Sequence, residues 1–134
     1  MIMKFLHTAL AVNDLDETIA FYEEVFDFKV KNSGERPEVG VKFVMVENQE
    51  GDILEFFEHQ KPQQAQQLEK DLMDFSKIGI KHFAFIVDNI EETMVKAVDA
   101  GAKIIWNIKK GVTVERIAFI ADPNDIPIEL VELN

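Results

Sequence analysis

Residues 7–18 read HTALAVNDLDET, and residues 82–93 read HFAFIVDNIEET. When His7 is aligned with His82, the residue types His, Ala, Val, Glu and Thr recur in register. A further pair of segments, ILEFFE at 53–58 and PIELVE at 127–132, aligns Glu55 with Glu129 after a slip of a single position. Each half of the chain therefore opens on a His and closes on a Glu, which predicts two structural units of one kind.

The pattern in the first half predicts one strand, one helix and three further strands. Residues 5–12 alternate two apolar faces, which indicates a strand buried on both sides. Asp14, with Glu17 three residues later, is typical of a helix start, and apolar residues at helical spacing continue to Phe26. Asp27 is expected to end this helix in the left-handed conformation. The strands expected next cover residues 28–33, 41–47 and 52–58.

The second half repeats this order. A strand at 79–87 precedes a helix that begins at Asp88 or Asn89 and has Gly101 as its C-cap. The strands expected next cover residues 103–108, 113–121 and 126–132. Each half is thus β-α-β-β-β, and we expect a single α+β domain of two tandem modules, covering about residues 3–59 and 79–133.

Residues 60–78, between the modules, are rich in Gln. Leu68, Leu72 and Phe75 follow helical spacing, so we expect a helical linker packed through one face. Low-complexity disorder is the alternative.

Composition excludes several classes of function. The 134 residues include no Cys, which rules out a disulfide framework, a thiolate metal site and a Cys nucleophile. The net charge of −11 opposes binding to nucleic acid or to an anionic membrane. No apolar run approaches the ~20 residues of a membrane span, and Met1 leads into a patterned segment rather than a signal peptide. We therefore expect a soluble, cytoplasmic protein that binds neither nucleic acid nor a membrane.

The repeated His and Glu residues are candidate metal ligands. Glu55 and Glu129 lie inside apolar strands, where an unpaired ionised carboxylate is costly to bury. Small same-face neighbours, such as Ala9 beside His7 and Ala84 beside His82, leave room for a ligand. If the modules pack about a pseudo-two-fold axis, two imidazoles and two carboxylates converge. Such a set suits a borderline divalent ion such as Ni, Co, Mn, Fe or Zn.

Over nearly its whole length the chain resembles the vicinal oxygen chelate superfamily, and within it glyoxalase I. The motifs that carry the resemblance are residues 7–15, 21–26, 82–87 and 119–130. The resemblance implies paired βαβββ modules that form a cup-shaped mixed sheet around one metal ion (Ni, Co, Zn or Mn), in a homodimer. The ligands that it implies are His7, Glu55, His82 and Glu129.

The ligand types distinguish among members of the superfamily. Extradiol dioxygenases and fosfomycin-modifying enzymes use two His and one Glu, and methylmalonyl-CoA epimerases commonly have Gln at the position of Glu55. Two His with two Glu is the glyoxalase I pattern. The resemblance thus implies a lyase that isomerises a hemithioacetal of a 2-oxoaldehyde such as methylglyoxal through a metal-bound enediolate, with Glu55 and Glu129 as the proton-transfer residues. Ala11 stands where glyoxalase I has a glutathione-binding Arg. The resemblance therefore does not imply which thiol forms the hemithioacetal.

Two other functions stay open. An acyl-CoA epimerase would use the same proton removal and return the proton to the opposite face of the same carbon. A binding protein of the bleomycin-resistance kind would use the negative charge to hold a cationic drug, and would need no metal.

Several other residues receive simpler interpretations. Glu58, Glu132 and His59 are expected at the solvated surface. A tight turn is expected at residues 122–125. Lys109 and Lys110 either contact an anionic substrate or lie in a solvated hairpin loop. Core packing is favoured over a substrate pocket for five large side chains, namely Phe43, Met45, Phe57, Trp106 and Phe119.

Overall fold

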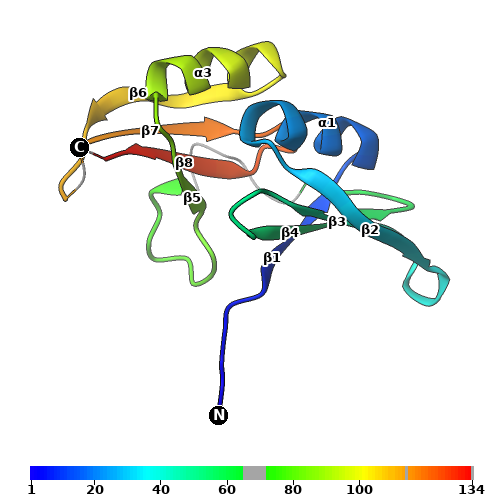
Figure 1. Ribbon diagram of the computed structural model, residues 1–134. Helices are drawn as coiled ribbons and strands as arrows, with labels where there is room; N and C mark the ends of the chain where they lie inside the picture. The colour runs from blue at the N-terminus through cyan, green and yellow to red at the C-terminus, as the bar shows by residue number, and fades with distance from the viewer. Residues whose placement is uncertain (65–71, 114, 134) are drawn as a thin grey trace. The chain divides into compact units, whose positions relative to one another are not determined.

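The computed structural model describes residues 1–64, 72–113 and 115–133. The chain divides into two compact units, Met1–Gln63 and Gln64–Asn134. The first contains β1 (His7–Val12), α1 (Leu15–Phe26), β2 (Lys29–Arg36), a short 3-10 helix (Pro37–Val39), β3 (Val41–Glu47) and β4 (Ile53–His59). The second contains β5 (Phe83–Ile86), α3 (Ile90–Asp99), β6 (Lys103–Lys110), β7 (Arg116–Ala121) and β8 (Pro127–Glu132) (Figure 1). The predicted α+β class and tandem βαβββ modules are confirmed.

Each unit is built on a four-stranded mixed sheet of the same topology. The strand orders are β1-β4-β3-β2 and β5-β8-β7-β6. The first strand of each unit runs parallel to the last, and the other pairs are antiparallel. Ala9 lies opposite Glu55 in one unit, as Ala84 lies opposite Glu129 in the other. The one-residue difference between the two sequence alignments therefore lies in the segments that connect the strands. The first and last strands of each unit pair in the same register.

The helices begin and end largely where the sequence predicts. The Asp14 side chain accepts a hydrogen bond from the Glu17 backbone N–H at 2.9 Å, and Asn89 caps α3 in the same way. Asp27 ends α1 with a φ of 60°, in the left-handed region. The second helix ends one residue earlier than predicted, because Ala100 is its C-cap and Gly101 follows with a φ of 109°.

One face of each sheet packs against the helix of its own unit. In the first unit Tyr22 of α1 lies 5.1 Å from Phe56 of β4 and 6.3 Å from Phe28, measured between ring centroids. In the second unit Ile90 and Ala97 of α3 are fully buried along with aliphatic side chains of β7 and β8. Apolar residues at helical spacing thus supply both cores, and the opposite face of each sheet is left for other contacts.

Three strand predictions need correction. The first strand is buried on one side only, since Ala9 and Ala11 are exposed and Leu10 and Val12 are buried. It begins at His7, later than predicted. The strand predicted over 79–87 covers only Phe83–Ile86, and the one predicted over 113–121 begins at Arg116. All three strands therefore begin later than the sequence pattern predicts.

The predicted helical linker does not extend over residues 60–64 or 73–78, which form turns and irregular structure. Leu72 is buried as expected, whereas Phe75 is 68% exposed and does not pack on the predicted face. Leu68 lies outside the described residues. No helix in the described part of the chain is long and apolar enough to cross a membrane.

Candidate metal centre

In the first unit, the parallel pair β1 and β4 brings His7 and Glu55 together. Ala9 lies two residues after His7 on β1, and Glu55 lies opposite Ala9 on β4. The side chains of His7 and Glu55 therefore project from the same face of the sheet. The Nε2 atom of His7 lies 3.3 Å from Oε1 of Glu55. The Glu55 side chain is only 17% exposed, so its carboxylate is largely shielded from water.

In the second unit, β5 and β8 hold His82 and Glu129 in the same way. His82 directly precedes β5, and its Nε2 atom lies 3.4 Å from Oε1 of Glu129. The Glu129 side chain is 22% exposed. All four predicted ligands therefore lie in two pairs of matching geometry, one pair in each unit.

The donor types and spacing of each pair fit half of a metal centre. Nitrogen and oxygen ligands at about 2.0–2.2 Å from a divalent ion lie about 3.0–3.4 Å apart at octahedral or tetrahedral angles. The two His–Glu separations fall in this range. Both Nδ1 atoms are buried and have no hydrogen-bond partner among the described residues. Each candidate cluster contains only two residues, since no three His, Asp or Glu side chains are clustered in the described ranges.

Glu58 and Glu132 were expected at the solvated surface, and this expectation is wrong. Each carboxylate accepts a hydrogen bond from the first N–H of the helix in its unit, Glu58 from Leu15 at 2.8 Å and Glu132 from Ile90 at 2.9 Å. These N–H groups have no partner within the helix. The signal in the sequence was the repetition itself, because both glutamates lie three residues after a candidate ligand.

Arg116 reinforces this contact in the second unit. It donates to Glu132 Oε1 from Nη2 at 2.6 Å and to Glu91 Oε2 from Nη2 at 2.9 Å, with a further bond from Nη1 to Glu91. The Ile90 N–H and the Arg116 guanidinium hold the pKa of Glu132 below its ordinary value, and Arg116 does the same for the pKa of Glu91. Paired with both carboxylates, the Arg116 guanidinium has a raised pKa.

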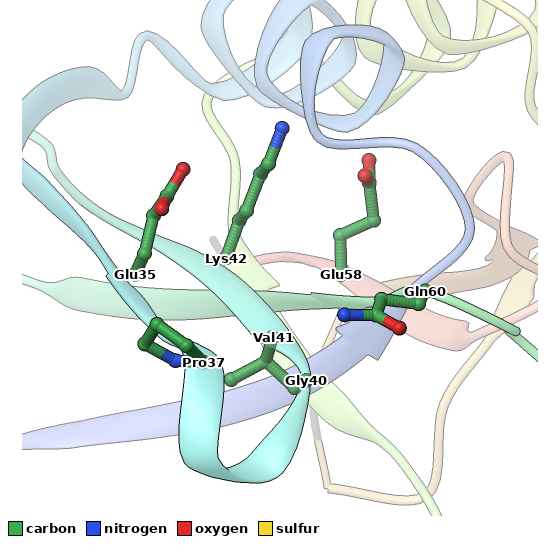
Figure 2. Close-up of a pocket in the computed structure, with 7 residues that line it drawn as sticks. All are labelled: Glu35, Pro37, Gly40, Val41, Lys42, Glu58 and Gln60. Atoms are coloured by element: carbon green, nitrogen blue, oxygen red, sulfur yellow. The ribbon is translucent and has the colours of Figure 1, made fainter.

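Lys42 takes the place of Arg116 in the first unit, in the same alignment that matches Glu58 with Glu132. It lies opposite Glu58 in the ladder between β3 and β4, as Arg116 lies opposite Glu132. Figure 2 shows the Lys42 and Glu58 side chains projecting from the same side of the sheet. No ion pair joins them among the described residues, and both line a pocket of about 140 Å³ beside Gly40 and Gln60.

The aromatic residues differ between the units. Phe119, 5% exposed, lies opposite Glu129, and its ring centroid is 4.9 Å from that of His82 and 5.1 Å from that of Trp106. Lys109, on β6, holds its Nζ atom 3.7 Å from the centroid of the Trp106 ring. Core packing is confirmed for Phe119, whereas Trp106 is only partly buried.

In the first unit Met45 lies opposite Glu55. Phe43 and Phe57 pack with their ring centroids 6.1 Å apart, and all three side chains are partly exposed. Ala11 is exposed opposite Phe57. The side chains beside the His–Glu pair of the first unit are therefore more exposed to solvent than Phe119 is in the second unit.

Two simpler predictions are confirmed. His59 is exposed, at the end of β4, and its Nδ1 accepts a hydrogen bond from the Lys61 N–H at 3.0 Å. Residues 122–125 form a tight turn, in which the Asp125 N–H donates to the Asp122 carbonyl oxygen at 3.0 Å.

Known proteins share both the sequence and the fold. The chain is 31% identical to the lactoylglutathione lyase of Shigella flexneri over 139 aligned positions, which cover 97% of this chain and 93% of that protein. It is 30% identical to the lactoylglutathione lyase of Haemophilus influenzae, with the same coverage.

Among solved structures, a glyoxalase family protein from Bacillus cereus superposes with a TM-score of 0.79 at 19% identity, covering 100% of this chain and 97% of that one. The trypanothione-dependent glyoxalase I of Leishmania major gives 0.74 at 24% identity, with 98% and 87% covered. These likenesses establish the fold. The model of the Glyoxalase/Bleomycin resistance protein/Dioxygenase superfamily matches residues 4–130, and the chain belongs to that superfamily.

Proposed function

We propose that this protein is a metal-dependent lyase of the glyoxalase I type. Its substrate is the hemithioacetal of a 2-oxoaldehyde, such as methylglyoxal, and its product is the 2-hydroxyacyl thioester. The observation that carries the proposal is the recurrence of one His–Glu pair in each unit at equivalent register positions. Relatives named lactoylglutathione lyase, about 30% identical over nearly the full length, support the same activity.

His7, Glu55, His82 and Glu129 would together hold one divalent ion, Ni, Co, Zn or Mn. The four ligands would come from one chain or be shared by two. When bound, such an ion supplies a Lewis acid that polarises the substrate oxygens and makes the neighbouring C–H more acidic. The donor set contains no sulfur, which agrees with this group of metals.

The two glutamates supply proton transfer. One carboxylate removes the proton from the carbon that carries sulfur, and one returns a proton to the adjacent carbonyl carbon. The hydroxyl of the first carbon loses its proton as it becomes the thioester carbonyl, and the former ketone oxygen becomes a hydroxyl. The reaction is an isomerisation and needs no redox partner. The Glu55 and Glu129 side chains are 17% and 22% exposed, so their carboxylates are partly accessible to a substrate.

The proposal is tested by metal analysis of protein purified without chelator, with methylglyoxal hemithioacetals of several thiols assayed in parallel. We expect one divalent ion per site and conversion of at least one hemithioacetal. Testing several thiols matters because Ala11 stands where glyoxalase I has an Arg for glutathione.

Two results would favour other functions. Solvent deuterium at the α-carbon of a racemised acyl thioester, without hemithioacetal turnover, would indicate an epimerase. Metal-free protein that binds a cationic glycopeptide in a salt-sensitive manner would indicate a sequestering protein.

A homodimer in the cytoplasm is part of the same proposal. A molar mass by light scattering of twice the 15.4 kDa chain would support the assembly.

A further inference from the structure

The chain between β5 and α3 is tied to β8 at two points. The Val87 N–H donates to the Val131 carbonyl oxygen at 2.8 Å, and the Ile90 N–H donates to Oε2 of Glu132 at 2.9 Å. Arg116 in turn holds the other oxygen of Glu132 from the neighbouring strand β7. These bonds connect the chain that follows His82 and β5 to Val131 and Glu132, which lie on the same strand, β8, as Glu129. The backbone positions of His82 and Glu129 are therefore linked beyond the end of β5 as well as through its pairing with β8.

The tie matters because His82 directly precedes a short strand, so the position of its ring depends on that strand as well as on its contact with Phe119. The strand β5 has four residues and lies at the end of its sheet order, and among the described residues β8 is its one neighbour in that sheet. Metal-binding His residues are usually oriented by a hydrogen bond at the second ring nitrogen. The Nδ1 atom of His82 is buried without such a partner among the described residues. The position of the imidazole relative to Glu129 therefore depends on how β5 sits on β8.

We propose that Glu132, itself fixed by Arg116, is a positioning residue for the His82–Glu129 pair. This inference rests on the proposed function, in which that pair binds metal. Glu132 lies three residues after Glu129 on the same strand, so the two carboxylates project from opposite faces and Glu132 is not a ligand of the same ion. It acts through the backbone of β5 and β8.

The first unit has the same contact between a Glu and the start of its helix, but without the Arg. Glu58 ties the start of α1 to β4, and β4 carries Glu55, but in the part of the chain that the structure describes no ion pair joins Lys42 to Glu58. Arg presents a rigid planar fork that can hold two carboxylates at once, whereas Lys presents a single mobile ammonium. The tie in the second unit is therefore the stiffer one, and its loss has the larger effect on metal binding.

The test is a titration of the metal-free full-length protein with Co²⁺, followed by visible absorption and by competition with a chelator. We expect Glu132→Ala to weaken Co²⁺ binding by about tenfold or more and to change the absorption band, since loss of outer contacts costs about 10–100-fold in metal sites. Glu132→Gln restores part of the affinity, because its amide oxygen still accepts from the Ile90 N–H.

Glu91→Gln is the matched control. It removes the negative charge of the other partner of Arg116 and leaves the bond from Ile90 to Glu132 intact. Its Co²⁺ affinity therefore stays within about twofold of wild type, far from the tenfold loss above. Thermal unfolding without metal shows whether each variant is folded. If Glu132→Ala does not fold, Arg116→Lys replaces it and is expected to weaken binding by about threefold, since the fork is lost.

The outcomes separate the two proposals. Wild-type protein that binds no Co²⁺ contradicts the proposed function, and this inference with it. Wild-type protein that binds Co²⁺, while Glu132→Ala (or Arg116→Lys in its place) keeps wild-type affinity and spectrum but melts earlier, overturns this inference alone, because Glu132 then serves only to cap the helix.

Discussion

The two units share one framework but differ in the residues beside their His–Glu pairs. Ala9, Glu55 and Met45 lie side by side across three strands of the first unit, where the second has Ala84, Glu129 and Phe119. The small residue and the carboxylate are repeated, and the third residue is not. The candidate ligands thus follow the repeat, whereas the residues beside them differ. Under the proposed function, we expect the repeated residues to bind the metal and the differing residues to affect the choice of substrate.

The largest expected effect is on turnover. Glu55→Gln and Glu129→Gln keep side-chain size and remove a base, so at least one of them should lower kcat by about 100-fold or more. Glu24→Gln, an exposed position on α1, is the control. The measurement is steady-state hemithioacetal conversion with metal content determined in parallel. Unchanged turnover in both single variants would rule out the assigned chemistry, and unequal losses would show which unit supplies the main base.

The difference in packing between the units is tested by truncation. Phe119→Ala empties a buried site between His82 and Trp106 and should lower the free energy of unfolding by about 3 kcal/mol. Met45→Ala removes a partly exposed side chain at the equivalent position and should cost less. Urea unfolding of both variants measures the difference. Equal losses would mean that the two surfaces are packed alike, contrary to the structure.

Exchanging the two basic residues probes the ties at the helix starts. Lys42→Arg supplies the first unit with the planar donor that Arg116 provides in the second, and should raise the melting temperature by about 2 °C. Arg116→Lys should lower it. Lys61→Arg, an exposed position of the first unit, controls for a general effect of Arg. If Lys42→Arg melts no higher than this control, Glu58 cannot accept a guanidinium as Glu132 does.

The smallest effect is a dependence of stability on pH. The pKa of Glu132 is lowered in the folded protein, so the unfolded chain binds more protons in the window below its ordinary value of 4.5. The stabilising contribution of Glu132 is therefore complete above that pH and is lost as the pH falls through the lowered pKa. The stability difference between wild type and Glu132→Gln should shrink below about pH 4.5. A constant difference down to pH 3 would contradict this.

The sequence was sufficient for the framework because the capping residues Asp14 and Asn89 and the alternation within β4 and β8 are local signals, and because the repeat shows that both halves have the same element order. The ties made by Glu58 and Glu132 were not predicted, because they join residues 43 and 42 positions apart. The same holds for the exposed face of β1, where Ala9 and Ala11 continue an apolar pattern without being covered. Periodicity reports which residues share a face but does not report what lies against that face.

The central claim is that two equivalent His–Glu pairs form one metal centre. The most direct test is the metal content of wild-type protein and of His7→Ala and His82→Ala, each purified without chelator and re-loaded with Co²⁺ under identical conditions. We predict one ion per chain in the wild type and loss of tight binding in either variant, although the two residues belong to different units. Full retention of the ion in either folded variant would contradict the claim.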